Sequence, residues 1–470
     1  MHYYDIYPQI VPADRVSEIR IHPRFSHAAI PRGGTWRLEM RHAPQTGVTG
    51  KGILPAYVWA DRDGVPLEWH LEESGDLVVR AYFAGEQEHN LELFITLDDN
   101  PDYFKNQSFK IYSLRPDWYG LRPFKIDSHL HTKGSDGREE CRYTVSRYRE
   151  KGFDAVAVTD HRRYEPSLEA AAAWRELVPD FNIIPGEEIH APDNPVHIVN
   201  FGGHSSVNDL YRADEPGYRR EVMKIASTLG SGVPKEIRFA VASCRWVFER
   251  VREAGGLAVF CHPYWIMSRM ALPEPLIDAV FADRKFDAVE LIGGFWLEQS
   301  EANNFQAVRC LEERGRGNFF PVLAVSDSHG TDAFPVNRPN IANFCGVSAT
   351  ESADAELFNW YYSVVLAEDS STPKLIESIR NDLSAAVEYP RGARPHIFGN
   401  FRLVKYVSFL LREYFPVHDP LCRDQGLAML DHLAGDASAA DRLALLRGRV
   451  ARRREAFFGG AAKSPAGSQS

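Results

Sequence analysis

Short apolar runs alternate with helical stretches from residue 124 onwards, and this alternation restricts the possible folds more than any other feature of the chain. The runs occupy residues 124–130, 154–159, 181–185, 196–201, 257–260, 287–292 and 321–325, and a further strand, helix and strand follow at 361–367, 373–381 and 385–389. Residues 242–254 and 301–314 are plausible helices between them. Strands that alternate with helices form a parallel sheet. This many units predicts an α/β barrel.

The remainder of the chain has other patterns, which predict further domains. Residues 1–120 contain short β-rich runs separated by turn signals, at 17–22, 35–40, 77–83 and 91–97, and these predict a small sandwich-like β domain. The barrel is expected over residues 121–395, with 205–240 as an insertion. A helical extension is expected over 396–457, from helices at 401–415, 421–433 and 439–457, and a disordered tail over 458–470.

Length and composition exclude several classes of protein. A chain of 470 residues is too long for one compact core. The net charge of −10 provides no basic footprint, so a nucleic-acid polymer is not an expected partner, although a nucleotide in a pocket remains possible. Six scattered cysteines without a CxxC pair indicate reduced thiols. The chain starts without a signal-peptide pattern and has no apolar stretch of about 18 residues, so we expect a cytoplasmic protein without a membrane partner.

Metal-binding side chains stand at the ends of five of the apolar runs. They are His129, His131 and Asp136 after the first run, Asp160 and His161 after the second, Glu187 and Glu188 after the third, His262, and Asp327 with His329. His197 opens the strand at 196–201. His129 and His131 are two positions apart, so on a strand both imidazoles point the same way. Since residues at the carboxyl ends of barrel strands gather on one face, the sequence predicts a metal-binding active site there.

The order and spacing of these groups resemble the polymerase-and-histidinol-phosphatase (PHP) family of metal-dependent phosphoesterases. The matching motifs are HxH with SDG (His129, His131, Asp136), TDH (His161), PGxE (Glu188), a strand histidine (His197), HP (His262) and SDxH (Asp327, His329). The resemblance covers about residues 124–390 and implies an α/β fold with a distorted (β/α)7 barrel. A β domain before such a barrel is similar to the carbaryl-hydrolase-like branch, which is a weaker likeness.

The resemblance implies two to three divalent transition metal ions, Zn, Mn or Fe. One ion would take His129, His131, Glu188 and Asp327; a second would share Glu188 and add His197 and His262; a third would use Asp136, His161 and His329. Glu187 is the rival of Glu188 for the bridging position, and the PGxE spacing favours Glu188. Mixed imidazole and carboxylate sites suit all three metals.

The expected reaction is hydrolysis of a phosphate ester of a small molecule, of nucleotide or sugar phosphate type, by a metal-bridged hydroxide. The predicted catalytic residues are Asp327, His329 and Glu188, of which Asp327 or His329 would accept or relay a proton. Two alternatives stay open. The same centre can hydrolyse a carbamate or carboxylic ester, and a metal-containing binding protein without catalysis is the second alternative.

Substrate contacts are less constrained by the sequence. Arg162 and Arg163 stand where many relatives carry Asn, and an arginine there would grip a phosphate or carboxylate, or else be a surface charge. Lys133 and Tyr264 are further candidates near the predicted mouth. Glu290 is expected either to orient a ligand histidine or to be buried for structural reasons. The remaining nearby histidines, His190 and His204, are not assigned to the site.

Overall fold

The computed structural model describes residues 3–42, 58–59, 66–98, 100, 104–267, 269–270, 272–293, 297–331, 357–390 and 392–459. The chain divides into two compact units. The first comprises Met1–Arg122, Ser408–His418 and Gly448–Ser470, and the second comprises Pro123–Val407 and Asp419–Arg447. The predicted disordered tail lies outside the described residues, apart from Phe458 and Gly459. Within the described ranges, no helix combines the length and the apolar character that crossing a membrane requires.

The first unit contains two β-sheets, with the strand orders β1-β3-β7-β6 and β2-β9-β8-β4-β5. The strands are β1 Tyr4–Tyr7, β2 Ile10–Pro12, β3 Arg15–Pro23, β4 Thr35–His42, β5 Val58–Trp59, β6 Leu67–Leu71, β7 Leu77–Phe83, β8 Gln87–Thr96 and β9 Phe104–Leu114. Buried and half-buried residues alternate along β8, and side chains from both sheets, including Ile19, Leu77 and Leu91, share one core. The four strands predicted in this region therefore correspond to β3, β4, β7 and β8.

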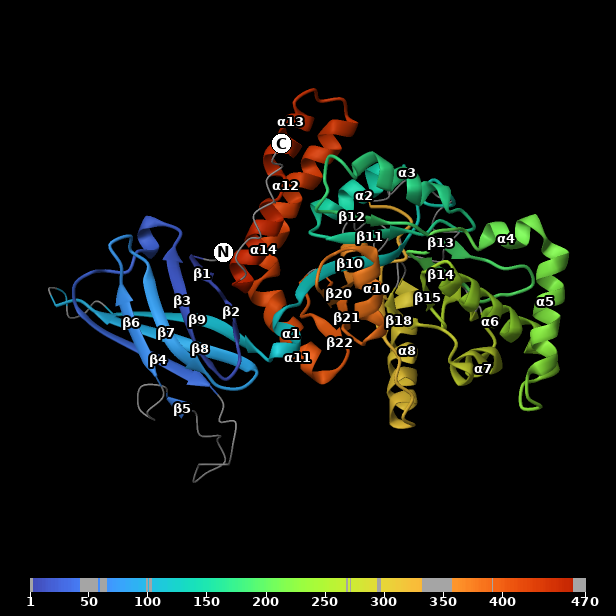
Figure 1. Cartoon of the computed structure of the whole chain (residues 1–470), viewed down its shortest axis with the longest axis horizontal. Coiled ribbons are helices and arrows are strands. Elements are labelled where there is room, and N and C mark those ends of the chain that lie inside the picture. The colour runs from blue at the N-terminus through green and yellow to red at the C-terminus, as the bar shows by residue number, and fades with distance from the viewer. Residues whose placement is uncertain are drawn as a thin grey trace, which may run out of the picture. The chain divides into compact units, whose positions relative to one another are not determined.

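The second unit is mixed α/β and contains two larger sheets, with the strand orders β12-β11-β10-β20-β21-β22 and β13-β14-β15-β18-β19 (Figure 1). The strands are β10 Arg122–Leu130, β11 Ala155–Val158, β12 Asn182–Ile184, β13 Gly186–Ile189, β14 Ile198–Phe201, β15 Leu257–Phe260, β18 Ala288–Gly293, β19 Val322–Val325, β20 Tyr361–Ala367, β21 Ser384–Glu388 and β22 His396–Phe398, and β16 Ile266–Met267 pairs with β17 Arg269–Met270. Each predicted apolar run from residue 124 onwards overlaps one of these strands.

The prediction of a parallel sheet is confirmed only for part of each larger sheet. Strands β10, β11 and β12 are parallel, as are β15, β18 and β19, but β13, β14 and β15 run antiparallel, and so do β20, β21 and β22. A parallel neighbour needs a crossover of a dozen or more residues. Only the short segment 190–197, which contains no helix, separates β13 from β14, so the chain returns in the opposite direction.

Two isolated parallel bridges, Leu130 to Ser328 and His161 to Glu188, connect the two sheets at the ends of their strands. Pro185 separates β12 from β13, since proline has no amide hydrogen to donate to a ladder, and β13 continues in the other sheet. The two larger sheets of this unit therefore stay separate, and no single closed (β/α)7 barrel is found among the described strands.

Of the helices that precede the C-terminal extension, the first along the chain belongs to the first unit and the others belong to the second. They are α1 Pro116–Tyr119, α2 Cys141–Glu150, α3 Glu165–Trp174, α4 Asn208–Ala213, α5 Glu215–Thr228, α6 Arg238–Glu253, α7 Glu274–Asp283, α8 Leu297–Gly315 and α10 Thr372–Arg380. The buried side chains of α6 recur at helical spacing, as Cys244, Val247 and Val251 show. The predicted insertion at 205–240 forms α4 and α5, and Tyr218 of α5 is buried in the same core as α6. Figure 1 shows α5 and α6 beyond β14 and β15.

The C-terminal helices are α11 Phe401–Glu413, α12 Phe415–Leu433, α13 Ala439–Leu446 and α14 Arg449–Phe458. The prediction of one continuous helix over 439–457 is wrong, because Gly448 adopts φ 73° and ends the helical path between α13 and α14. Five cysteines are buried free thiols, and Cys345 lies outside the described residues.

Candidate metal centre

The backbone brings the end of β10 beside the segment that follows β19. The amide of Asp327 donates to the carbonyl of His129 (3.0 Å), and the amide of His131 donates to the carbonyl of Ser328 (2.8 Å). Beneath them, the carboxylate of Asp127 accepts hydrogen bonds from the amides of His129 and Ser326 (3.1 and 3.3 Å). Burial raises the pKa of Asp127 to about 7, against the lowering effect of these donors. The first two histidines are therefore held by a rigid, buried frame.

Glu188 is the central carboxylate, and six imidazole rings surround it. From Oε2 the distances are 3.4 Å to His129 Nε2, 3.5 Å to His131 Nε2, 2.6 Å to His161 Nδ1 and 3.6 Å to His190 Nε2; from Oε1 they are 2.8 Å to His197 Nδ1 and 3.5 Å to His262 Nε2. The side chain is fully buried, yet neither oxygen accepts a hydrogen bond. A buried carboxylate in that condition is unstable unless a cation compensates it.

Asp327 is a second buried carboxylate that contacts two of these rings. Its Oδ1 lies 3.0 Å from His131 Nε2 and 3.4 Å from His129 Nε2, and those two nitrogens are 3.1 Å apart. The Nδ1 of His129 lies 2.8 Å from Glu290 Oε1. His129, His131 and Asp327 each direct one electron-pair donor atom to the same point, as the ligands of a metal ion do.

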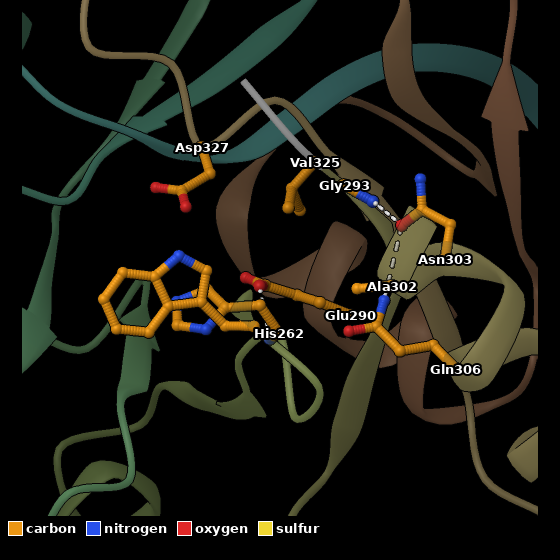
Figure 2. Close-up of a pocket in the computed structure, with 9 residues that line it drawn as sticks. His262, Glu290, Gly293, Ala302, Asn303, Gln306, Val325 and Asp327 are labelled. Carbon is orange, nitrogen blue, oxygen red and sulfur yellow. Dashed lines mark hydrogen bonds between the residues drawn. The ribbon is translucent and has the colours of Figure 1, made fainter. Parts of the chain in front are cut away.

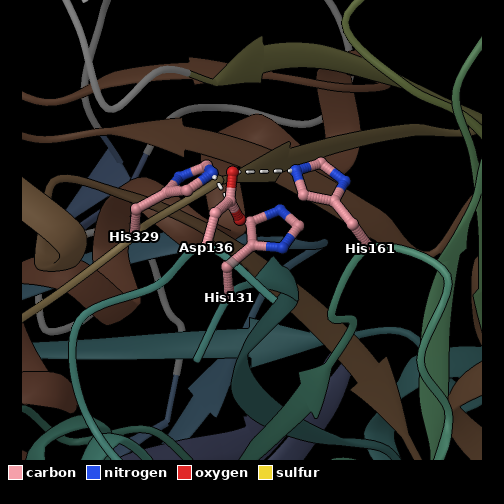
Figure 3. A group of neighbouring side chains, drawn as sticks. All are labelled: His131, Asp136, His161 and His329. Carbon is pink, nitrogen blue, oxygen red and sulfur yellow. Dashed lines mark ion pairs between the residues drawn. The ribbon is translucent and has the colours of Figure 1, made fainter. Parts of the chain in front are cut away.

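A second group lies on the outer side of His131 (Figure 3). Asp136 approaches His161 Nε2 with Oδ2 and His329 Nε2 with Oδ1, both at 3.4 Å. The ring of His131 lies between them, with its centroid 4.3 Å from that of His161 and 4.4 Å from that of His329. The Asp136 side chain is 50% exposed, so this group faces solvent while Glu188 does not.

A small cavity of about 10 Å³ adjoins His262 (Figure 2). Its lining includes Asp327, Glu290 and, from α8, Asn303 and Gln306. Its volume corresponds to about one water molecule. His262 and Asp327 both have positive φ, at 23° and 49°. Non-glycine residues rarely adopt this conformation, and such local strain is concentrated at functional sites.

The charges in the cluster strongly shift the pKa values of its side chains. Burial alone would raise the pKa of Glu188, but His161, His197 and His129 hold it well below the usual value. Burial opposes protonation of His161, but the carboxylates of Glu188 and Asp136 raise its pKa to about 10. Burial, together with the charges of His329 and His161, lowers the pKa of His131 to about 3. Positive charge is therefore favoured here, although some of the rings are kept neutral.

Glu187 points away from this cluster. Its carboxylate accepts hydrogen bonds from Ser206 Oγ (2.7 Å), Asn208 Nδ2 (2.7 Å) and the amide of Val207 (2.5 Å) at the start of α4. Adjacent residues of a strand face opposite sides, so β13 directs Glu188 to the histidines and Glu187 to the helix. Glu187 therefore has a structural environment, and Glu188 has the environment of a ligand.

The residues predicted to contact the substrate lie in different environments. Lys133 and Arg163 are exposed and form ion pairs with Glu140 (3.3 Å) and Glu165 (3.4 Å). The hydroxyl of the buried Tyr264 donates to Glu274 on α7 (3.2 Å).

Arg162 is exposed, and its amide donates to the carbonyl of Glu188 (2.8 Å). It borders a surface depression of about 660 Å³ whose lining includes His190, Tyr211 and Arg212. Of the predicted cations, Arg162 is therefore next to an open depression that reaches a ring of the cluster.

Sequence reasoning did not assign His190, whose Nε2 lies 2.8 Å from His161 Nδ1. The signal was present, since His190 is two positions after Glu188 and so shares its side of the chain, by the rule that paired His129 with His131. His204 is exposed. Glu290 contacts two histidines, because its Oε2 also accepts a hydrogen bond from the amide of His262 (3.0 Å).

Comparisons with known proteins give partial matches. No family model matches the chain. An uncharacterized protein of Methanocaldococcus jannaschii is 24% identical over 182 residues, which cover 36% of this chain and 82% of that protein. A solved two-domain protein of Bacteroides vulgatus, which contains a predicted PHP-like metal-dependent phosphoesterase, is 17% identical over 58% of this chain and 67% of that chain, with a TM-score of 0.36.

Two further solved structures match most of their own length. A candidate metal-dependent phosphoesterase of Bifidobacterium adolescentis is 24% identical over 44% of this chain and 87% of that chain, with a TM-score of 0.31. An amidohydrolase of Chromobacterium violaceum with bound sulfate and no metal is 20% identical over 43% and 87%, with a TM-score of 0.30. At these identities and TM-scores, the functional conclusion depends on the side chains of this chain.

Proposed function

We propose that this chain is a PHP-type metal-dependent hydrolase that cleaves a phosphate ester of a small molecule, of nucleotide or sugar phosphate type. One observation carries the proposal. The fully buried carboxylate of Glu188 accepts no hydrogen bond and is surrounded by six imidazoles, with Asp327 beside two of them. Such a set of side chains offers unshared electron pairs and negative charge. A divalent cation binds the first and compensates the second.

The residues fit two to three divalent transition metal ions, such as Zn, Mn or Fe. The proposed ligand sets are His129, His131, Glu188 and Asp327; Glu188, His197 and His262; and Asp136, His161 and His329. When bound, such ions lower the pKa of a coordinated water and stabilise negative charge on phosphate oxygens. Histidine and carboxylate donors are acceptable to all three metals.

The chain's own residues would orient the substrate and move a proton. Oδ1 of Asp327 lies 3.0 Å from Nε2 of His131, and the ring of His329 lies 4.4 Å from the ring of His131. Either residue would accept a proton from the attacking water. Arg162 borders the depression that His190 also lines, where it would bind an anionic group, and Lys133 and Arg163 stay candidates for further positive charge near the substrate. A guanidinium binds phosphate through paired donors.

The proposal extends to the fold of the second unit. Each of the two sheets supplies strands whose ends carry the ligands, and the bridges Leu130–Ser328 and His161–Glu188 occur where those strands approach. This arrangement supports a distorted (β/α)7 barrel that is divided into two sheets by its antiparallel segments. Membership of the carbaryl-hydrolase-like branch stays a prediction.

A substrate panel tests the reaction. The purified protein, loaded separately with Zn²⁺, Mn²⁺ and Fe²⁺, is incubated with nucleotides, sugar phosphates and an aryl phosphate, and in parallel with aryl esters and carbamates. We expect release of inorganic phosphate that is lost in Glu188→Gln. Turnover of carbonyl compounds alone would replace the phosphoesterase assignment with the ester or carbamate alternative, and no turnover by fully metallated protein would favour a binding protein.

A further inference from the structure

His190 lies beside the cluster but belongs to none of the three proposed ligand sets. We infer that His190 is a metal ligand and that it forms, with His161 and Glu188, a cation position that the three proposed ligand sets do not contain. This inference rests on the proposed function insofar as the chain must bind metal. It concerns which residues hold the ions, and it is independent of the substrate.

The three donor atoms have the spacing that one cation requires. Nε2 of His190 lies 2.8 Å from Nδ1 of His161 and 3.6 Å from Oε2 of Glu188, and the latter two atoms are 2.6 Å apart. Metal bonds of about 2.0–2.2 Å place neighbouring ligand atoms about 3 Å apart. The side chains of His190 and His161 are 17% and 24% exposed, so the position is mostly enclosed but retains access to solvent.

The ring of His190 is held in place before any ion binds. It stacks on the ring of His197, with the centroids 3.8 Å apart and an angle of 19° between the planes. The carbonyl of His190 accepts a hydrogen bond from the hydroxyl of Tyr211 on α4 (3.1 Å), which ties the segment after β13 to that helix. A side chain fixed by packing loses little conformational entropy on binding, which favours its use as a ligand.

A hydrogen bond between the two rings is the competing explanation. In that arrangement Nε2–H of His190 donates to Nδ1 of His161, and both ring nitrogens are satisfied. Nδ1 of His161 then accepts a hydrogen bond and cannot donate one to Oε2 of Glu188, which lies 2.6 Å away and is buried without a hydrogen bond in the structure. A cation among the three atoms satisfies all of them at once, and for this reason the geometry favours ligation.

Titration of the metal-free protein with Co²⁺ tests the inference, with competing chelator to measure affinity and the visible absorption of Co²⁺ to report its coordination. The variants are His190→Gln, His190→Asp and the matched control His204→Gln. We expect His190→Gln to weaken one equivalent by more than about 10-fold, since even the loss of an outer partner of a ligand costs that much. Its absorption spectrum should also change, while His190→Asp, which restores an electron-pair donor, should recover the affinity.

The outcomes separate this inference from the proposed function. An isotherm and a spectrum of His190→Gln that equal those of the wild type and of His204→Gln would overturn ligation by His190 and leave the metal centre intact. Weaker binding in His190→Gln that His190→Asp does not recover would also overturn it, in favour of the hydrogen bond between rings. Binding of less than one equivalent by the wild type would instead defeat the proposed metal-dependent function.

Discussion

Glu290 Oε1 lies 2.8 Å from Nδ1 of His129, so the proton of that ring is directed to Glu290 and its Nε2 faces Asp327 and Glu188. A carboxylate in this position fixes the tautomer and orientation of a metal-ligating imidazole. Glu290 also accepts a hydrogen bond from the amide of His262, so one side chain orients two members of the cluster.

We therefore expect Glu290→Gln to weaken metal binding by about 10–100-fold, which is the usual effect of losing such a partner. Chelator competition measures the affinity. Glu312→Gln on the exposed side of α8 is the control and should bind metal as the wild type does. Equal affinities in the two variants would show that Glu290 is buried for structural reasons only.

Glu187 and Glu188 should respond oppositely to the same substitution. Glu188→Gln should remove bound metal and activity while the fold persists, because the position serves the cluster. Glu187→Gln should keep the metal but lower the free energy of unfolding by about 2 kcal/mol, since its amide cannot accept all the hydrogen bonds at the start of α4. Plasma mass spectrometry and chemical denaturation measure the two effects. Metal loss in Glu187→Gln with retention in Glu188→Gln would reverse the assignment.

The metal-free protein should lose stability as the pH rises above neutrality. The pKa of His161 in the folded chain is about 10, above the usual 6.5 of an unfolded chain. The protonated ring therefore stabilises the fold fully below pH 6.5, and this contribution is lost as the pH rises towards 10. We expect a decrease of about 2 kcal/mol between pH 7 and pH 9 from this group.

Urea unfolding of the chelated protein over that pH range measures the loss, with His161→Gln as the comparison. The slope in the variant should be shallower by the contribution of one proton. A slope that is the same in both proteins would mean that His161 is not the group that titrates.

Alanine substitutions of Arg162 and Arg163 are a matched pair of variants that tests substrate binding. Arg162→Ala should raise KM for the phosphorylated substrate by about 10-fold or more, with a smaller effect on kcat, since a charged hydrogen-bond donor to substrate is worth about 1.5–3 kcal/mol. Arg163→Ala should change KM little, because its guanidinium is paired with Glu165 at the surface. Steady-state kinetics at constant ionic strength decide between them, and a larger effect at Arg163 would contradict the expected side of approach.

The sequence predicts the strands well because their apolar runs end in chemically distinctive residues. His129, Asp327 and His262 could be placed together without knowledge of the sheets, since strand ends meet in any barrel-like arrangement. The direction of β13 and β14 was not predictable from alternation, because the antiparallel return depends on the missing crossover after Ile189. His190 obeys the spacing rule that identified the first pair, but its ring position depends on stacking against His197, which a sequence pattern does not encode.

His161 presents one nitrogen to Asp136 and the other to Glu188 and His190. A neutral imidazole has one nitrogen with a free lone pair. The ring can therefore ligate an ion on only one of these two sides until its N–H proton moves to the other nitrogen. Transfer of an ion from one side of the ring to the other would then be coupled to movement of a proton, and the rate of exchange should be slower in deuterated solvent.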